Sequence, residues 1–486
     1  MKRFFWSLLG IVCLLVAIIV IRTIRFVSRQ IHVPPASVII LDANAAVKRL
    51  SQAIQHETVS LQNPAKADAA EFLRFHQFLA GSFPALHSHL TKEVIGGYSL
   101  LYTWKGKSDS LKPLMMMGHM DVVPVDPSSE NNWTHPPFAG QIADGYIWGR
   151  GSMDDKGNVL AILEAVEHLL HTRFQPQRTI YLAFGHDEEV GGENGAAKIA
   201  GLLRSRHVEL DYVVDEGGNI TDGIVPGVAL PVALIGVAEK GYLSLELSVD
   251  SPGGHSSTPP PHTAIGILSN SIHKLEAAPF SSRLPKPTRG FLEFIGPEMK
   301  WPQKMIAANL WIFAPVLKRQ LEKPPLSNAM IRTTQAATVF EGGVKENILP
   351  TRARAVVNLR ILTGETVAGV IDHIRRVIDD PQVKIAPLPV RMEPSSVSDT
   401  RSASFKLIQQ TINEIMPEAL VAPFLLVAAT DSRHYASLTK NIFRFLPIKI
   451  RPEDAQRYHG IDERISVEDY ERCMRFFVQL IRNSQS

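Results

Sequence analysis

The chain has 486 residues, 45% hydrophobic and 20% charged, an ordinary globular balance at a length that exceeds a single hydrophobic core. Its formal net charge of +3 is concentrated in residues 1–30, which contain no acid and five bases, so the remainder carries a charge of −2. These values exclude a nucleic-acid-binding surface, and two cysteines without metal-type spacing, Cys13 and Cys473, exclude a disulfide scaffold or a cysteine zinc site.

The N-terminal segment carries a membrane signal. Residues 4–21 form an uncharged run of 18 residues, long enough to span a bilayer as a helix. The run ends in Ile21-Arg22-Thr23, without the small residues of a cleavage site, which favours an uncleaved anchor over a signal peptide. Basic residues flank both ends, so the orientation stays open. We expect residues 1–30 to be a membrane anchor or signal segment, with the body outside the cytoplasm.

After a linker over 22–40, the pattern alternates between helix and strand. Apolar residues three and four apart predict amphipathic helices over 41–55, 66–83, 156–172 and 194–206. Short apolar runs predict strands over 113–117, 179–185 and 210–214. Strands that alternate with helices are typical of βαβ units, so we expect an α/β fold with a mostly parallel sheet flanked by helices.

A second domain is predicted as an insertion, because the pattern changes near Glu239 and the first pattern resumes near residue 402. Between them lie strand patterns over 241–251, 330–340, 353–362 and 383–388 and helix patterns over 262–277 and 365–379. These favour helices on one face of a smaller antiparallel sheet. The returning pattern is a helix over 403–416, a buried strand over 420–430 and a helix over 466–483. We therefore expect an inserted lid or dimerisation domain over 239–393, within a domain made of 41–238 and 394–486.

Residues 286–325 fit neither domain pattern. They contain Trp301, Trp311, Phe313 and Pro315 in short helical pieces. Two interpretations stay open: the segment is additional core or a loop cover, or it is an apolar wall for a substrate.

Metal-ligand residue types stand directly after the predicted strands of the first domain. His119 and Asp121 follow the first strand, Glu188 and Glu189 the second, and Asp215 ends the third. Open α/β sheets place their chemistry outside the carboxyl ends of the strands. Oxygen and imidazole ligands without cysteine favour zinc or a similar divalent ion used in hydrolysis.

Each motif also has an ordinary interpretation. The loop Gly149–Gly157 opens a helix, so Asp154 or Asp155 is an expected helix cap, and a carboxylate in this loop can also bridge two metals. The pair Glu188-Glu189 is either a solvated turn or one ligand beside one proton acceptor. His459, in a loop before the last helix, would by itself be an exposed residue.

Jointly, the motifs are specific, and they stand in this order: GHMDVVPV (118–125), GRGSMDDKG (149–157), GHDEEVGG (185–192), VVDEGG (213–218), GGHSS (253–257), NILP (347–350), TDSR (430–433) and YHG (458–460). Over residues 41–480 the chain resembles the zinc aminoacylase and carboxypeptidase family of metallopeptidase clan MH, which includes carboxypeptidase S and acetylornithine deacetylase. Residues 239–257, 328–334 and 450–460 are most similar to its branch of secreted N-fatty-acyl-amino-acid synthases/hydrolases.

The resemblance implies two zinc ions, with cobalt or manganese as possible substitutes. His119 and Asp215 would hold one ion, Glu189 and His459 the other, and Asp154 would bridge them. The peptide bond after Asp154 is typically cis in this family.

The resemblance also implies the remaining roles. Asp121 would orient His119, and Glu188 would be the general base. His255 would reach into the site of a partner in a homodimer and stabilise the oxyanion. The substrate carboxylate would be held by Asn347 and Arg360, and Arg433 would also contact the substrate.

The expected function is a di-zinc amidohydrolase that cleaves N-acyl amino acids, with a long acyl group and in a reversible reaction. A carboxypeptidase or dipeptidase that acts on short peptides is the alternative, and a non-catalytic membrane-tethered binding protein is a remote one. The expected partners are such a small molecule, a membrane through residues 1–30 and a second copy of the chain, but no nucleic acid.

Overall fold

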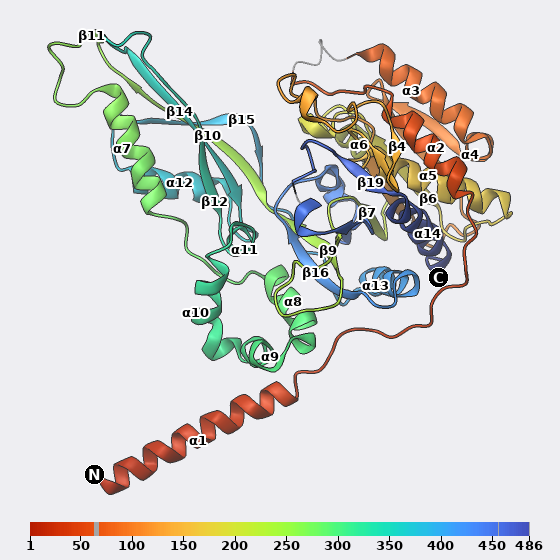
Figure 1. The fold of residues 1–486 in the computed structure, drawn as a ribbon, viewed down its shortest axis with the longest axis horizontal. Helices are drawn as coiled ribbons and strands as arrows, with labels where there is room; N and C mark the ends of the chain where they lie inside the picture. Colours follow the sequence, from red (N-terminus) through yellow and green to blue (C-terminus); the bar gives the residue numbers. More distant parts are fainter. Residues whose placement is uncertain (63–67, 455, 486) are drawn as a thin grey trace.

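The computed structural model describes residues 1–62, 68–454 and 456–485. The N-terminal helix α1 (Lys2–Ile24) projects away from the rest of the molecule, which divides into a larger body and a smaller sheet (Figure 1). The predicted helix over 66–83 begins at Lys66 and Ala67, which lie outside the described residues, and α3 (Ala69–Ser82) occupies the rest of that range.

The body is built on a ten-stranded sheet. Its order is β1 (Thr91–Ile95), β2 (Ser99–Trp104), β6 (Ile180–Gly185), β3 (Leu114–His119), β7 (Tyr212–Asp215), β17 (Ile442–Arg444), β9 (Val232–Glu239), β8 (Ile220–Thr221) and β18 (Lys449–Ile450), and β16 (Leu420–Leu426) pairs with β9. The central strands β6, β3, β7 and β17 run parallel. The predicted α/β fold with a mostly parallel central sheet is confirmed.

Helices cover both faces of this sheet because alternate strand residues point to opposite sides. On one face, Leu114 and Met116 pack in a core with α2 (Ala43–Ile54), α4 (Pro84–His89), α5 (Lys156–His171), α13 (Ala403–Ile415) and α14 (Val467–Asn483). On the other face, Met115 and Met117 pack against α6 (Ala196–Ser205) and the 3-10 segment η5 (Asp431–Ser437). A strand buried on both sides explains the continuous apolar run before His119.

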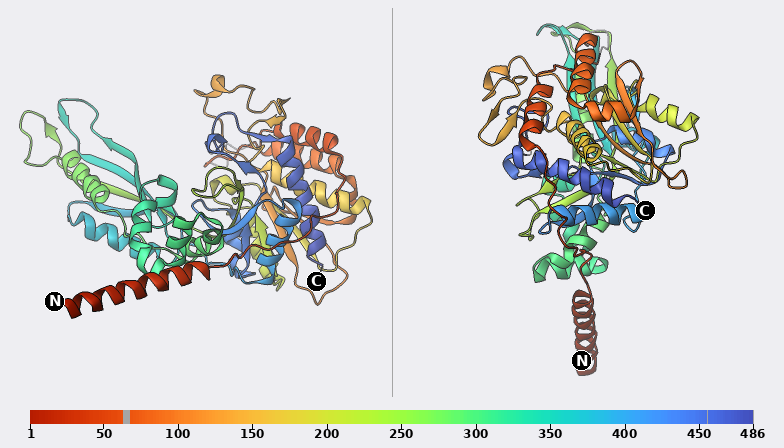
Figure 2. Two further views of the ribbon diagram at one scale, coloured as in Figure 1. Left: turned by 60° about the horizontal axis from the view of Figure 1, so that its bottom comes forward. Right: turned by 90° about the vertical axis from the view of Figure 1, so that its right-hand side faces the viewer.

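The small sheet is antiparallel, with the order β12 (Thr334–Gly342), β14 (Arg352–Ile361), β10 (Gly241–Asp250) and β15 (Lys384–Met392). Leu243, Leu245 and Leu247 of β10 pack in one core with residues of α7 (Ala264–Ala277) and α12 (Val367–Ile378). At the far tip, β11 (Gly254–His255) pairs with β13 (Ile348–Leu349) (Figures 1 and 2). The boundaries at 239 and 393 stay a prediction, and the whole small sheet lies between them.

Residues 286–325 form a chain of short helices that joins the small sheet to the body. They comprise α8 (Lys286–Ile295), η4 (Gly296–Glu298), α9 (Trp301–Ala308), α10 (Leu310–Leu321) and the start of α11 (Pro325–Ala329). Phe294 and Ile295 of α8 belong to the core of the body, so the interpretation as additional core holds for α8. It does not hold for α10, none of whose residues is buried.

A short three-stranded sheet brings the end of the chain next to the Asp154 loop. Its order is β19 (Arg464–Ser466), β5 (Tyr146–Trp148) and β4 (Ile142–Ala143). β19 directly follows the His459 loop, and β5 directly precedes Gly149. Segments more than 300 residues apart are therefore adjacent through the β19–β5 pairing, as with Arg464 opposite Trp148.

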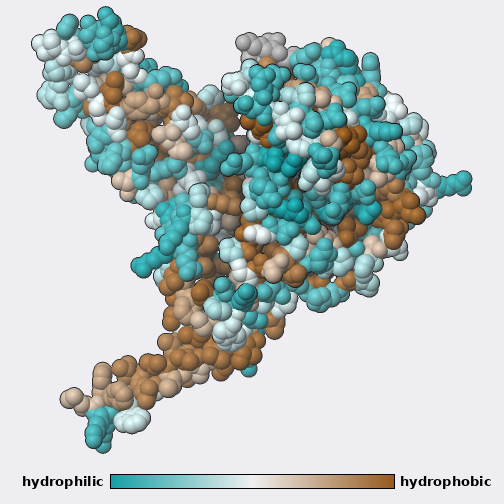
Figure 3. Space-filling model, viewed as in Figure 1, coloured by the Kyte–Doolittle hydropathy of each residue, from teal (hydrophilic) through white to brown (hydrophobic). Residues whose placement is uncertain are grey.

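Among the described residues, α1 is the one helix long and apolar enough to cross a membrane. Its apolar window has a mean hydropathy of 3.0, and none of that window is buried. A membrane anchor and a signal sequence both fit this description. Its side chains form a continuous hydrophobic surface that leads up to the body (Figure 3).

Candidate active site

The predicted strand-end residues lie at one edge of the central sheet. β3 ends at His119, which pairs in register with Gly185 at the end of neighbouring β6. The 3-10 turn η3 (Glu188–Val190) follows β6 after two residues, and β7 on the other side of β3 ends at Asp215. The parallel order of these strands therefore gathers the residues from three separate motifs.

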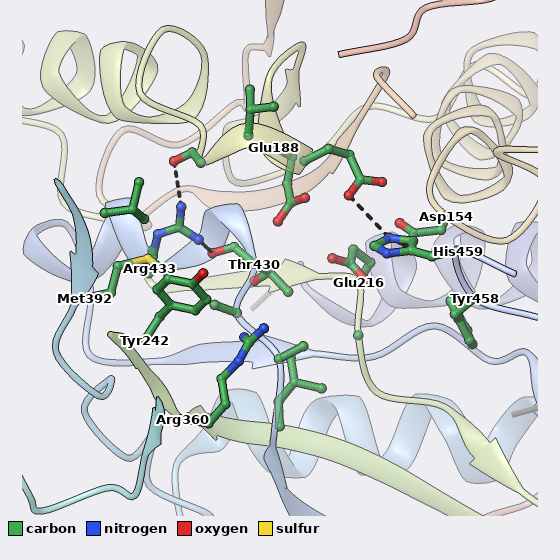
Figure 4. Close-up of a pocket in the computed structure, with 18 of the residues that line it drawn as sticks. Asp154, Glu188, Glu216, Tyr242, Arg360, Met392, Thr430, Arg433, Tyr458 and His459 are labelled. Carbon is green, nitrogen blue, oxygen red and sulfur yellow. Dashed lines mark hydrogen bonds and ion pairs between the residues drawn. The ribbon is translucent and has the colours of Figure 1, made fainter. Parts of the chain in front are cut away.

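Asp154 lies between the two histidines. Asp154 Oδ1 is 2.9 Å from His119 Nε2, and Asp154 Oδ2 is 3.1 Å from His459 Nε2. His459 Nε2 is also 3.3 Å from Glu189 Oε2, so that the imidazole lies between two carboxylates (Figure 4). Each Asp154 oxygen thus faces a different imidazole, the arrangement that a bridging carboxylate requires. The Asp154-Asp155 peptide bond is cis, as the resemblance implies.

Asp121 connects His119 to the acidic turn. Its backbone carbonyl accepts a hydrogen bond from His119 Nδ1 at 2.9 Å, while its carboxylate Oδ1 is farther from that nitrogen, at 3.4 Å. This bond assigns the ring proton to Nδ1 and leaves Nε2 free for a cation. The Asp121 carboxylate instead accepts the backbone N–H groups of Glu188 at 3.2 Å and Glu189 at 3.1 Å, together with the Ser60 hydroxyl.

Asp215 is buried at the end of β7, and its Oδ2 accepts the backbone N–H of Ser432 at 3.1 Å. Within the described residues, one group of potential ligand atoms converges to within 4.8 Å, and it consists of His119, Asp154 and Glu189. Asp215 is not part of this group.

Two residues that the sequence analysis missed hold the Asp154 loop. The buried Glu463 accepts the backbone N–H groups of Gly151, Met153 and Asp154 at 3.0, 2.9 and 3.1 Å. Its other oxygen pairs with Arg150 at 2.5 Å, and Arg150 also donates to the carbonyl of His459 at 3.1 Å. The sequence signal that could have identified Glu463 is its position four residues after His459 in the same loop.

The site concentrates carboxylates that are costly to ionise together. Burial raises the pKa of Glu188 well above its ordinary value, and neighbouring Asp431 and Glu189 raise it further against the opposing effect of His119. Burial also raises the pKa of Glu189 and, together with Asp154, that of Glu216. Burial would raise the pKa of Asp154, but the neighbouring His119 and His459 outweigh it and lower that pKa.

The residues present fit a divalent cation. A tetrahedral zinc with bonds of about 2.1 Å separates its ligand atoms by about 3.4 Å, close to the imidazole-to-carboxylate distances of 2.9–3.3 Å found here. Among the described residues, Glu189 Oε1 is buried without a hydrogen-bond partner, as are both carboxylate oxygens of Asp431. A cation would satisfy such oxygens and reduce the repulsion among the acids.

A cavity of about 930 Å³ lies beside this cluster, between the body and the small sheet. The body contributes Asp154, Glu188, Glu216, Thr430, Arg433 and His459, and the small sheet contributes Tyr242, Ser244, Arg360, Leu388, Pro389, Val390 and Met392 (Figure 4). The Arg360 guanidinium stacks 4.8 Å from the Tyr242 ring centre, and burial lowers its pKa. Arg433 donates to the carbonyls of Gly191 at 2.6 Å and Thr430 at 2.8 Å.

His255, Asn347, Trp301 and Trp311 lie away from this cavity. His255 and Asn347 are exposed together at the far tip of the small sheet, where Ser256 N donates to the Asn347 carbonyl at 3.2 Å. Trp301 and Trp311 do not line the cavity, and about half of each side chain is exposed. The interpretation of these tryptophans as a wall for substrate is therefore wrong: they project from α9 and α10 on the outside of the molecule.

A parallel α/β sheet that gathers histidines and carboxylates at its strand ends, beside a large cavity, defines a metal-dependent hydrolase. Residues 115–483 match the peptidase family M20/M25/M40, and the chain belongs to this family. It is a zinc-dependent hydrolase that acts on amide bonds, which excludes the alternative of a non-catalytic binding protein.

Two curated relatives are similar over nearly the whole chain. The probable carboxypeptidase S-like 2 of Dictyostelium discoideum is 43% identical over 488 residues, which cover 98% of this chain and 93% of the relative. An N-fatty-acyl-amino acid synthase/hydrolase of Danio rerio is 42% identical over 445 residues, covering 89% and 84%. Among solved structures, the M20 family metallo-carboxypeptidase Sso-CP2 of Sulfolobus solfataricus has a TM-score of 0.66 at 18% identity, covering 90% of this chain and 98% of its own, and shares the fold.

Proposed function

We propose that the protein is a di-zinc amidohydrolase that cleaves N-acyl amino acids with a long apolar acyl chain. The observation that carries this proposal is the cavity itself, which combines a half-buried arginine, an apolar wall and the acid–histidine cluster. Because a catalyst accelerates both directions, the same site could also condense a fatty acid with an amino acid.

The proposed ligands are those at the strand ends and in the two loops. His119 and Asp215 would hold one ion, Glu189 and His459 would hold the other, and Asp154 would bridge them. The separate imidazole contacts of the two Asp154 oxygens support the bridging role. Bound zinc would polarise the amide carbonyl and make water more acidic.

Glu188 is the proposed general base. Both glutamates line the cavity, and Glu189 also pairs with His459, so we assign ion binding to Glu189 and proton transfer to Glu188. A carboxylate with a raised pKa accepts a proton from the attacking water more readily than an ordinary one and then protonates the departing amine.

Arg360 and Asn347 are the proposed sites for the substrate carboxylate, and Arg433 is proposed to contact the substrate as well. Within the described part of the chain, no carboxylate pairs with Arg360, although this residue is half-buried and its guanidinium stacks on Tyr242. A charge of this kind is stabilised when an anion binds beside it. The requirement for a free α-carboxylate on the substrate follows from this arrangement.

The apolar acyl chain is assigned to the wall of residues 388–392. Leu388, Pro389, Val390 and Met392 of β15 line the cavity together with Leu426 at the end of β16. The volume of about 930 Å³ is near the upper end of the range of small-molecule sites, about 300–1,000 Å³. A short dipeptide would leave much of it unfilled.

Two further assignments concern residues that lie away from the cavity. His255 and Asn347 lie away from the cavity of their own chain, so we assign them to the cavity of a partner in a homodimer, where His255 stabilises the oxyanion. Helix α1 is assigned as a membrane anchor, with the body outside the cytoplasm.

The decisive experiment compares oleoyl-phenylalanine with Gly-Leu and N-blocked dipeptides as substrates of the zinc-loaded protein. The proposal predicts preferred turnover of oleoyl-phenylalanine and much slower turnover of its amide-capped form. Turnover of the peptides alone would instead establish the second candidate, a carboxypeptidase or dipeptidase, which the similarity to the carboxypeptidase S-like relative favours.

A further inference from the structure

Helices α9 and α10 present an apolar face to the outside. None of the twelve residues of α10 is buried, although it contains Leu310, Trp311, Ile312, Phe313, Val316, Leu317 and Leu321. Trp301 at the start of α9 is 52% exposed, Trp311 54% and Val316 48%. We call Trp301, Trp311 and Val316 the tryptophan face. Large apolar side chains left outside a core in this way mark a contact surface.

This face lies next to the membrane-type helix. The buried Asn309, between α9 and α10, donates from Nδ2 to the Ile19 carbonyl at 3.2 Å and to Thr23 Oγ1 at 3.1 Å. Phe26, just after α1, packs where Gly296 leaves room for its ring. The C-terminal end of α1 is thereby fixed against α9, and the hydrophobic surface continues from α1 into the body (Figure 3).

Charge near the tryptophan face is mostly positive. Between residues 298 and 323 there are five basic residues, Lys300, Lys304, Lys318, Arg319 and Lys323, and two acids, Glu298 and Glu322. Glu322 is paired with Arg332 at 2.7 Å, so one of these acids is already neutralised. Arg22 and Arg25 add two further cations at the end of α1. Tryptophan with lysine and arginine is the combination found at the boundary between hydrocarbon and lipid headgroups.

We propose that α9 and α10 rest in the interface of a lipid bilayer, beside the point where α1 leaves it, with Trp301, Trp311 and Val316 in contact with lipid. The contacts of Asn309 determine the depth: if residues 4–21 span the hydrocarbon, Ile19 and Thr23 are at its edge, and the helices that bind them are at the same level. The anchor and the tryptophan face thus form one continuous membrane-contacting surface. It fixes the orientation of the body against the bilayer, which a flexible linker alone would leave free.

The test uses the full-length chain, because its two native cysteines suit site-specific labelling. Cys473 is buried and Cys13 is exposed on α1. In a Cys13→Ser background, single variants Trp301→Cys and Val316→Cys carry an environment-sensitive fluorophore, and Val344→Cys, 91% exposed between β12 and β13, is the matched control. The native Cys13, labelled in the unmodified chain, reports insertion of α1. The proteins are reconstituted in vesicles of phosphatidylcholine and phosphatidylglycerol.

The expected result is a blue-shifted emission at positions 13, 301 and 316, with quenching by spin-labelled lipid several-fold stronger than at 344. Aqueous iodide should quench position 344 several-fold more strongly than the other three. The proposal is overturned if 301 and 316 behave like 344, or if they are shielded from both quenchers, which would indicate coverage by protein such as a second copy. An aqueous signal at position 13 would also overturn it. Because no readout depends on turnover, the result is independent of the proposed amidohydrolase activity.

Discussion

Arg150 and Glu463 form a buried ion pair of 2.5 Å across 313 residues of sequence. The pair joins the Asp154 loop to the His459 loop, because Glu463 binds the backbone of the first and Arg150 the backbone of the second. The relative position of Asp154 and His459 therefore depends on two residues that lie outside the proposed ligand set.

Replacing Glu463 should weaken both the fold and the site. Glu463→Gln leaves Arg150 as a buried charge without its partner, which costs about 3–5 kcal/mol of unfolding free energy. Urea unfolding measures this loss, and zinc affinity should fall in parallel. Glu468→Gln, which removes the exposed partner of Arg472 on α14, is the control and should change stability by less than about 1 kcal/mol. Equal effects of the two variants would contradict the role assigned to Glu463.

Glu188→Gln should retain zinc and lose turnover. Removal of a general base lowers the rate by about 10²–10⁴-fold, while the contacts of His119, Asp154 and His459 are left in place. Metal analysis and steady-state kinetics on one preparation separate the two effects. Glu193→Gln, an exposed acid in the same loop, serves as the control. A Glu188→Gln protein with near-normal turnover would rule out its role as base.

Arg360→Ala should raise KM selectively for substrates with a free carboxylate. Loss of a charge-assisted contact of about 1.5–3 kcal/mol corresponds to a rise of about 10–150-fold. An amide-capped analogue, already a poor substrate, should be insensitive to the change. Arg352→Ala, on the same strand but exposed and paired with Glu246, is the matched control. Equal losses on capped and free substrates would indicate a structural role for Arg360.

His255→Ala should be rescued by mixing if the active site is shared between two chains. Co-refolding His255→Ala with Glu188→Gln lets one chain supply the base and its partner supply the histidine. Random pairing would restore about one quarter of the wild-type rate. His262→Ala, another exposed histidine before α7, should remain active on its own. Absence of any recovery in the mixture would show that the site is contained within a single chain.

Lys240 should make stability depend on pH. It lies between β9 and β10, where Nζ donates to the carbonyls of Ala329 at 3.0 Å and Arg332 at 2.9 Å, and burial lowers its pKa from 10.5 to about 7. Between these values the unfolded chain binds a proton that the folded chain has released, so stability rises with pH. Above pH 10.5 the buried lysine is neutral in both states and costs no stability. The free energy of unfolding then decreases as the pH falls from 10.5 to about 7.

The measurement for Lys240 is urea unfolding across that pH range. Lys240→Met should reduce the slope of stability against pH by up to about 1.4 kcal/mol per unit. Lys384→Met, at an exposed lysine of β15, should preserve the slope. If the free energy of unfolding of Lys240→Met changes with pH as steeply as that of the unmodified protein, the amine stays charged in the folded protein.

The strand-end residues were predictable because parallel sheets impose both a buried apolar run and a common edge. The runs before His119, Glu188 and Asp215 carried that pattern, and the structure places all three at the carboxyl ends of β3, β6 and β7 or just after them. The adjacency of His459 to Asp154 has no local signature, since it depends on the pairing of β19 with β5. In the sequence, only the family resemblance placed His459 and Asp154 in one site.

Two features of the structure could not be predicted from local sequence patterns, for different reasons. In the sequence alone, Arg150 and Glu463 cannot be told from exposed charged residues of a loop, because burial of an ion pair depends on what surrounds it in three dimensions. The helices α9 and α10 have the composition of a core, but they lie outside it, where Asn309 forms a hydrogen bond with α1. Aromatic content indicates that a segment is apolar without indicating which partner covers it.

The late position of His459 and Glu463 has a consequence for biosynthesis. Glu463 follows Asp154 by 309 residues, and His459 lies four residues before Glu463. While the chain is still being translated, His119, Asp154 and Glu189 can already be present on folded strands, yet the loop that completes their surroundings has not been made. With the proposed ligand set, the cation is therefore retained only after the loop that contains His459 and Glu463 has been translated and has folded against the Asp154 loop.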